Sequence, residues 1–276
     1  MSPLAERELL HRGRGDPPGS TWGSLGMWQV DGCDYASACA ALARAVAQAA
    51  ELAPGERVLS VACGGGDELL LWVEEFDAAQ AVGVEMDRAL VHAARGLATR
   101  VNPASRRRIA VMQGSGAELE ALLQDAAPFD CLLCVDAAYH LRSRTAFLQS
   151  ALRLLRPGGR LAYTDLVADT SSVWLRAAAR VCGLPGSELQ AANAQVLRLR
   201  AAGFEDVQLT RLDDAVLAGF ARFVRRQERR LGRDAWCAAW RRPAVTARLI
   251  GPCRAAGLGY ALLAARKPAP IASATT

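Results

Sequence analysis

Residues 57–67, which read RVLSVACGGGD, decide the fold. The apolar run 57–63 has the length and composition of a strand buried on both faces. It leads directly into three glycines, 64–66, and a helical pattern follows over 68–75. Glycines at such a turn let backbone amides approach a ligand, and the N-terminus of the following helix favours a carboxylate or phosphate. The stretch therefore predicts a strand–turn–helix unit with a ligand-binding turn.

The same alternation of strands and helices continues on both sides of this stretch. We expect further strands over 79–85, 108–113, 130–135 and 160–164, and helices over 35–52, 88–100, 119–124 and 145–155. Asp87 is the expected N-cap of the second of these helices. Because strands that alternate with helices form right-handed crossovers, the pattern predicts a doubly wound parallel α/β sheet of Rossmann-like type.

The rhythm changes after Asp165. Helices are expected over 171–182 and 187–201, and strands over 204–210 and 259–265 with no strand–helix alternation between them. The sheet is therefore expected to be mostly parallel with an antiparallel edge strand. The helical insert before the last strand would lie as a lid over the strand ends, where ligands bind in such sheets.

Four segments follow from this division. We expect an N-terminal arm and helix over 1–53, with 1–24 as a loose, polar stretch, and a core over 54–268. The helical insert would occupy about 211–256, and 269–276 would form a tail.

Composition excludes several classes of protein. The chain has 276 residues, 51% of them hydrophobic, and a net charge of +5, but Lys267 is its one lysine. A nucleic-acid-binding protein would more often show clustered lysines and arginines with interleaved aromatics, and charge alone is weak evidence, so nucleic acid is not the expected partner. The start lacks a signal-peptide pattern and no long apolar run is present, so we expect a cytoplasmic protein without a membrane span.

Cys131 and Cys134 form a CxxC pair inside the predicted strand 130–135. Residues three apart on a strand point to opposite faces, so a shared metal ion is not expected. We expect no metal site in this protein.

Glu85 ends the second predicted strand, 21 residues after Gly64. A carboxylate there can accept hydrogen bonds from both hydroxyls of a ribose. A dinucleotide-binding oxidoreductase would share these two features. Its fingerprint requires a third glycine at position 69, which is leucine here, and this weakens that alternative.

The segments together resemble the class I S-adenosylmethionine (SAM)-dependent methyltransferases. ERVLSVACGGGDE is similar to the family's first motif, and VGVEMD, FDCLLCVDAAYHL and LRLLRPGGRLAYTD resemble the motifs around the second, fourth and fifth strands. LRAAGFEDVQL and GYALLAARKP resemble the sixth and seventh strands, and residues 24–28 resemble the LGYW-like segment of small-molecule members.

This resemblance implies SAM as the cofactor and assigns its contacts. Gly64 and Gly66 would contact the methionine part, Glu85 the ribose and Met86 the adenine. The other positions carried over as cofactor-binding are Trp28, Tyr35, Ala62, Ser115, Gly116, Ala117 and Asp136. Of these, Trp28 and Tyr35 would close the site, because an aromatic ring attracts a sulfonium.

Three positions depart from the family's pattern. Ser60 stands where the first motif has an acid, Ala62 where it has a glycine, and Ser115 where an acid follows the third strand. Asp67 and Glu118 are alternative acceptors for the ammonium and adenine amine of SAM. The departures leave open a SAM-binding regulator that has lost turnover.

His140 and Asp165 follow the fourth and fifth strands, and some relatives that methylate hydroxyls have a histidine and an acid there. We expect His140 as general base and Asp165 as its orienting partner. A structural role for His140 stays open.

We therefore expect methyl transfer to a small molecule, with a hydroxyl oxygen as the first choice of acceptor. A carboxylate, nitrogen or carbon acceptor remains an alternative, and a carboxylate would need no base. The arginines of the insert are either a solvated face or a clamp for an anionic substrate; they are Arg222, Arg225, Arg226, Arg229, Arg230 and Arg233.

Overall fold

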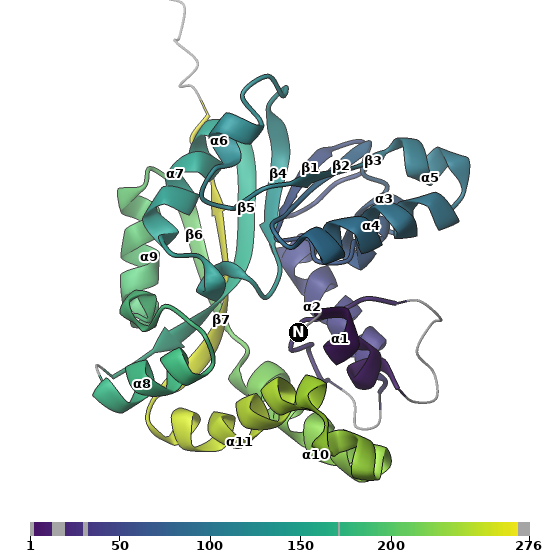
Figure 1. Ribbon diagram of the computed structural model, residues 1–276. Coiled ribbons are helices and arrows are strands. Elements are labelled where there is room, and N and C mark those ends of the chain that lie inside the picture. Colours follow the sequence, from purple (N-terminus) through teal and green to yellow (C-terminus); the bar gives the residue numbers. More distant parts are fainter. Residues whose placement is uncertain (1–2, 13–19, 30–32, 171, 270–276) are drawn as a thin grey trace, which may run out of the picture.

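Seven strands form one sheet in the order β3-β2-β1-β4-β5-β7-β6, as the computed structural model shows (Figure 1). The structure describes residues 3–12, 20–29, 33–170 and 172–269. The strands are β1 (Arg57–Val61), β2 (Gln80–Glu85), β3 (Ile109–Gln113), β4 (Phe129–Cys134), β5 (Leu155–Ala168), β6 (Glu205–Arg211) and β7 (Leu258–Arg266). Only β7 runs antiparallel to its neighbours, and it lies between β5 and β6. The predicted fold class is confirmed.

The helices cover both faces of this sheet. They are α1 (Pro3–His11), α2 (Tyr35–Ala49), α3 (Asp67–Glu74), α4 (Arg88–Arg100), α5 (Pro103–Arg107), α6 (Leu119–Leu122), α7 (Arg144–Leu154), α8 (Val173–Val181), α9 (Ala192–Ala201), α10 (Gly219–Leu231) and α11 (Arg241–Ala255). One core joins α2, α3, α10 and α11 to the sheet, and a second joins α7 and α9 to the other face. In the described part of the chain, no helix has the length and apolarity that a membrane crossing requires.

The strands alternate between these two cores. Cys131 belongs to the first core and Cys134 to the second, as the period of a strand requires. Within the described residues, no group of histidine, cysteine and acidic side chains has the arrangement of a metal site.

Local capping explains several helix starts. The Asp34 carboxylate accepts the N–H of Ser37 at 2.7 Å before α2. Asp87 accepts the N–H groups of Ala89 and Leu90 at 2.8 and 3.2 Å before α4, which confirms it as the predicted cap. Such a cap contributes about 1 kcal/mol.

The sequence analysis placed some elements imperfectly. The arm expected to be loose contains α1, which packs with its buried Leu9 and Leu10 against the core. Helix α5 was not expected, although Asn102 caps it and Pro103 opens it. Strand β5 extends to Ala168 because β7 pairs with it along its whole length from Arg160 onward. Residues 13–19 of the arm and 270–276 of the tail lie outside the described residues.

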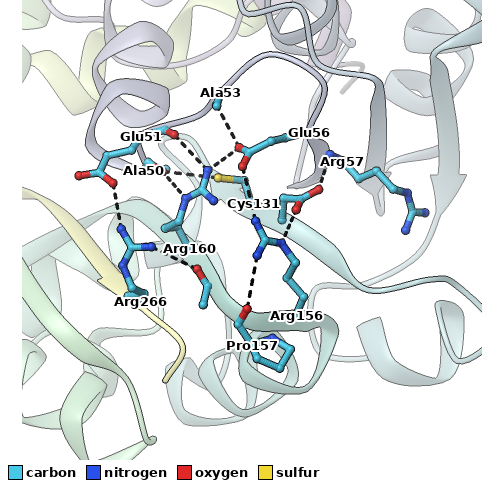
Figure 2. Close-up of polar contacts among 12 residues, drawn as sticks. Ala50, Glu51, Ala53, Glu56, Arg57, Cys131, Arg156, Pro157, Arg160 and Arg266 are labelled. Atoms are coloured by element: carbon cyan, nitrogen blue, oxygen red, sulfur yellow. Dashed lines mark hydrogen bonds and ion pairs between the residues drawn. The ribbon is translucent and has the colours of Figure 1, made fainter. Parts of the chain in front are cut away.

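A polar cluster joins the end of α2 to the amino ends of the strands (Figure 2). Arg160 donates to the carbonyls of Ala50 and Glu51, both at 3.0 Å, and pairs with Glu56. Arg266 of β7 pairs with Glu51 at 2.9 Å. The cluster holds the end of α2 and the end of β7 together. It lies at the end of the sheet opposite the carboxyl ends of the parallel strands.

The Gly96→Ala variant is expected to be more stable than the wild type. Gly96 lies inside α4, and a Cβ built there meets no atom within 4 Å. Alanine in a helix interior is favoured over glycine by about 0.5–1 kcal/mol, mainly through backbone entropy. Urea unfolding should show this gain. The matched variant Gly66→Ala should lose stability, because Gly66 has φ +92° and its Cβ would lie 3.0 Å from that of Ala94.

Candidate functional site

Two hollows meet at the carboxyl ends of the strands. The first, here called the cleft, spans about 1790 Å³ including its open mouth and runs along the ends of β1, β2 and β3. The second, here called the apolar pocket, spans about 1130 Å³ including its mouth and lies beneath α8, α10 and α11. Figure 1 shows these helices gathered at one end of the sheet. The residues that line both hollows are Glu6, Gly23, Ser24, Asp136, His140 and Arg242.

The glycine turn and Glu85 form one wall of the cleft. The Glu85 carboxylate accepts the N–H of Gly64 at 3.0 Å and that of Asp87 at 2.9 Å. Gly64 has φ +58° and Ala62 has φ +60°, so the chain turns sharply at the end of β1. A left-handed φ favours glycine, so Ala62 adopts a backbone conformation that is unfavourable for its side chain.

The cleft contains most of the predicted cofactor contacts. Met86 is 71% exposed at its rim, and is therefore free to pack on a planar ligand. The predicted residues that line the cleft are Ala62, Gly64, Glu85, Met86, Ser115, Gly116, Ala117 and Asp136.

Three predicted cofactor residues lie elsewhere. Gly66 caps α3 and allows close packing against Ala94 of α4. Trp28 stacks on Phe223 of α10 with ring centroids 4.6 Å apart, and Tyr35 stacks on the same ring at 5.1 Å. Tyr35 lines the apolar pocket, but neither aromatic ring nor Gly66 lines the cleft. By stacking on Phe223 of α10, the Trp28 and Tyr35 rings join the N-terminal segment to the helical insert.

The acid missing at Ser60 is replaced from the neighbouring helix. Glu68 of α3 is buried, lines the cleft and accepts a hydrogen bond from the Ser60 hydroxyl. Burial raises the pKa of Glu68 to about 8. The sequence signal was available, since Glu68 is the second residue of the helix that follows the strand of Ser60, but the direction of its side chain decided that this acid reaches back to Ser60.

The arm covers the cleft from the other side. Asp67, one of the predicted acceptors, is instead bonded to Thr21, whose backbone N–H lies 3.0 Å from its Oδ2. Thr21 lies directly over Gly65, where a Cβ would clash with its hydroxyl at 1.8 Å. Arg7 of α1 donates to the Thr21 carbonyl and lines the cleft. The sequence analysis did not single out Arg7 or Thr21.

Asp136 lies at the junction of the two hollows in a network of tyrosine and backbone donors. Its Oδ1 accepts the Tyr260 hydroxyl and its Oδ2 the N–H of Leu25, both at 2.5 Å. Burial raises the pKa of Asp136 to about 6, although the hydroxyls of Tyr260 and Tyr139 oppose the shift. Its φ of +54° is rare for a non-glycine residue, which fits a residue fixed by its surroundings at a ligand site.

His140 also faces both hollows, at the end of a short helical turn, Ala138–His140, after β4. The His140 side chain is exposed at the hollows, but partial removal from water still lowers the pKa of His140 to about 4, and the charges of Arg242 and Arg144 act in the same direction. The ring is therefore neutral at pH 7 and able to accept a proton.

Asp165 does not lie beside His140. Both of its carboxylate oxygens pair with the Arg144 guanidinium, at 2.9 and 3.0 Å, and Gln195 donates to Oδ2 at 3.3 Å. Burial raises the pKa of Asp165, and the ion pair opposes that shift. Among the described residues, no hydrogen bond joins Asp165 to His140. We therefore assign Asp165 to the structural support of the site and drop it as the partner of a base.

The arginines of the insert lie on the outer side of α10. Neither hollow is lined by Arg222, Arg225, Arg226, Arg229, Arg230 or Arg233. Among these, Arg222, Arg225, Arg229, Arg230 and Arg233 are exposed. The arginine that faces both hollows is Arg242, at the start of α11, which no sequence pattern marked.

The unpartnered Ser24 hydroxyl marks the same junction. Its Oγ is buried and has no hydrogen-bond partner within the described residues. A buried hydroxyl without a partner costs about 1–3 kcal/mol. A bound ligand with an oxygen or nitrogen at this point would satisfy it.

Comparisons with known proteins agree with this geometry. Residues 35–209 match the sequence model of a family described as "Methyltransferase domain". The chain is 28% identical to erythromycin 3''-O-methyltransferase of Saccharopolyspora erythraea over 70% of its own length and 65% of the relative's. It is also 28% identical to O-methyltransferase cnsE of Penicillium expansum, over 57% of its length and 55% of the relative's. The match thus spans less than two thirds of either relative.

Solved structures share the fold. The [4+2]-cyclase SpnF superimposes with a TM-score of 0.73 at 23% identity, covering 96% of this chain and 93% of that one. The likeness concerns the fold alone. Residues 24–28 lie outside the matched family range, so the resemblance to an LGYW-like segment stays a prediction.

Proposed function

Because the chain belongs to the class I SAM-dependent methyltransferases, we propose that it transfers a methyl group from SAM to a hydroxyl oxygen of a small, largely apolar acceptor. The observation that carries this proposal is the shared wall of the two hollows. A cofactor in the cleft and an acceptor in the apolar pocket would meet where Ser24, Asp136 and His140 line both.

The residues of the cleft fit SAM. Glu85 would accept the ribose hydroxyls, and Met86 and Ser115 to Ala117 would border the adenine. Glu68, buried beside the glycine turn, would bind the ammonium of the methionine part, and this would favour its ionised form. Arg7 would face the carboxylate of that part, because its guanidinium lies next to Gly64.

SAM, when bound, supplies an electrophilic methyl carbon, to which the acceptor oxygen bonds while the carbon–sulfur bond breaks and its electron pair stays on sulfur. The protein's part is mainly alignment in a site that excludes water. His140 would take the hydroxyl proton, for which its neutral ring is suited. Asp136 accepts bonds from Tyr260 and Leu25 and would thereby hold the arm and β7 at the junction, and each of its oxygens keeps a second lone pair for a ligand.

An oxygen acceptor is favoured by two observations. The two curated relatives described above are named as O-methyltransferases. A neutral histidine at the junction is also useful for a hydroxyl and unnecessary for a carboxylate. Nitrogen and carbon acceptors remain second candidates.

Ligand binding separates this proposal from a nicotinamide oxidoreductase and from a regulator without turnover. We expect SAM and S-adenosylhomocysteine to raise the melting temperature and NAD or NADP to leave it unchanged. An enzyme must then release S-adenosylhomocysteine when supplied with an acceptor. Stabilisation by a pyridine nucleotide instead of SAM would contradict the proposal.

The Glu85→Ala variant is expected to bind SAM about 10–100-fold more weakly, because hydrogen bonds to a charged group contribute about 1.5–3 kcal/mol. Isothermal titration calorimetry measures this change. Glu74→Ala is the matched control, since Glu74 is exposed on α3 and outside the lining of the cleft. Equal affinities for all three proteins would exclude Glu85 from the cofactor site.

A further inference from the structure

Arg242 brings a solvent-exposed positive charge without a hydrogen-bonded partner among the described residues to the junction. It lies in the first turn of α11 and lines both the cleft and the apolar pocket. Among the described residues, its guanidinium forms no hydrogen bond and no ion pair. Of the other arginines that line these hollows, Arg144 pairs with Asp165 and Arg7 donates to the Thr21 carbonyl, whereas the exposed Arg142 lines the cleft alone and not the apolar pocket.

The carboxylates nearby do not neutralise Arg242 by contact. Glu6 and Asp136 line the same hollows and are both influenced by its charge. Asp136 directs its oxygens to Tyr260 and Leu25. Burial raises the pKa of Glu6, an effect that Arg242 opposes. The guanidinium therefore keeps its donors for a ligand.

The rest of the apolar pocket sets the character of that ligand. Its walls are mostly apolar and come from the arm, α8, α10 and α11, with Leu10, Leu175, Phe220, Pro243 and Ile250 among them. A ligand held here would therefore be of the mainly apolar kind that such pockets bind. Its body would be apolar, and its polar end would meet Arg242, His140 and the unpartnered Ser24 hydroxyl.

We propose that the acceptor is an apolar molecule whose reacting oxygen binds as an anion against Arg242. This proposal rests on the methyl transfer proposed above; it restricts the acceptor to an acidic oxygen and, unlike that proposal, includes carboxylates. Charge-assisted bonds from a guanidinium stabilise such an oxygen more strongly than they stabilise a neutral hydroxyl. Two sources share this chemistry, namely a phenol or enol, and a carboxylate.

The two kinds of acceptor differ in whether they need His140 as a base. A phenol or enol must lose its proton, which the neutral ring of His140 can accept while Arg242 stabilises the oxygen left behind. A carboxylate arrives ionised and needs no base. The charged and titratable residues that line the apolar pocket are Glu6, Tyr35, Asp136, Tyr139, His140, Arg144, Cys182, Arg242 and Cys253.

The first experiment uses 4-nitrophenol, whose anion absorbs visible light, with the full chain and S-adenosylhomocysteine. We expect the bound phenol to ionise about one pH unit or more below the free phenol, because a neighbouring guanidinium shifts acids by about 1–3 units. Arg242→Met should abolish the shift and Arg242→Lys should keep part of it. Arg241→Met is the matched control, since Arg241 is exposed on the same helix and lines neither hollow.

The second experiment compares decanoate with 1-decanol by calorimetry under the same conditions. We expect decanoate to bind at least about tenfold more tightly, as one charge-assisted hydrogen bond implies, and Arg242→Met to remove the difference. If only the ionisation of bound 4-nitrophenol shifts, the acceptor is a phenol or enol. If only decanoate is preferred over 1-decanol, the acceptor is a carboxylate.

Three results would overturn the proposal: neither probe binds, neither shows a preference for the anion, or Arg242→Met retains the preference. SAM affinity, measured separately on each variant, keeps this test apart from the proposed function. A wild-type chain that binds no SAM would contradict the proposed function whatever the probes do.

Discussion

The His140→Ala variant is expected to lower kcat about 10²–10⁴-fold for any hydroxyl acceptor that the wild type methylates, which is the usual contribution of a general base. The affinity for SAM should not change, because the loss concerns proton removal alone. His92→Ala is the matched control, since His92 is exposed on α4 and lines neither hollow. With a carboxylate acceptor, His140→Ala should keep its activity.

The pH profile gives an independent test of this assignment. A base must be unprotonated, so wild-type kcat should fall as the pH decreases through the pKa of His140, about 4. The profile should be flat between that value and neutrality. An acid limb near pH 6 that persists in the His140→Ala variant would instead assign the proton acceptor to Asp136, whose pKa is about 6. An unchanged kcat in His140→Ala with a hydroxyl acceptor would contradict the assignment.

The Asp165→Leu variant is expected to lose about 3–5 kcal/mol of unfolding free energy, because it leaves the buried Arg144 guanidinium without its partner. The Arg144 and Asp165 side chains are 2% and 0% exposed, so water cannot replace the lost bonds. Urea denaturation at pH 7 measures the change. The double variant Arg144→Met with Asp165→Leu should recover much of the loss, because two apolar side chains can replace a buried ion pair.

An exposed ion pair provides the matched comparison. Asp214 pairs with Arg254 at 2.5 Å, but the Asp214 side chain is 88% exposed. Asp214→Ala should therefore cost no more than about 1 kcal/mol. If Asp165→Leu folds with wild-type stability and instead loses only activity, Asp165 acts in the chemistry and our structural assignment is wrong.

Much of the fold was accessible from local pattern. The predicted helix over 88–100 matches α4 at both ends, because Asp87 caps it and its apolar residues repeat with helical period. The start of α9 at Ala192 and the full length of β5 could not be predicted from local pattern. Strand β5 owes residues 165–168 to pairing with β7, a partner nearly a hundred residues later, and its first residue, Leu155, pairs with Phe129 of β4; no local signal records such pairing.

The candidate site likewise has residues that local pattern predicts and contacts that it does not predict. Gly64, Glu85 and Met86 were found because a turn and two adjacent strand ends fix their positions through local geometry. The pairing of Asp165 with Arg144, the stacking of Trp28 and Tyr35 on Phe223, and the approach of Glu68 to Ser60 were not found. Each depends on which side chains meet after packing.

The sequence by itself determined the doubly wound sheet, the glycine turn with Glu85 and the place of His140 after β4, because short-range periodicity and strand ends fix these features. Only the tertiary structure decided that Arg242 of the lid and Arg7 of the arm reach the ends of the strands. Their positions result from the packing of α1, α10 and α11 against one core, an arrangement of segments more than two hundred residues apart for which the chain carries no local pattern.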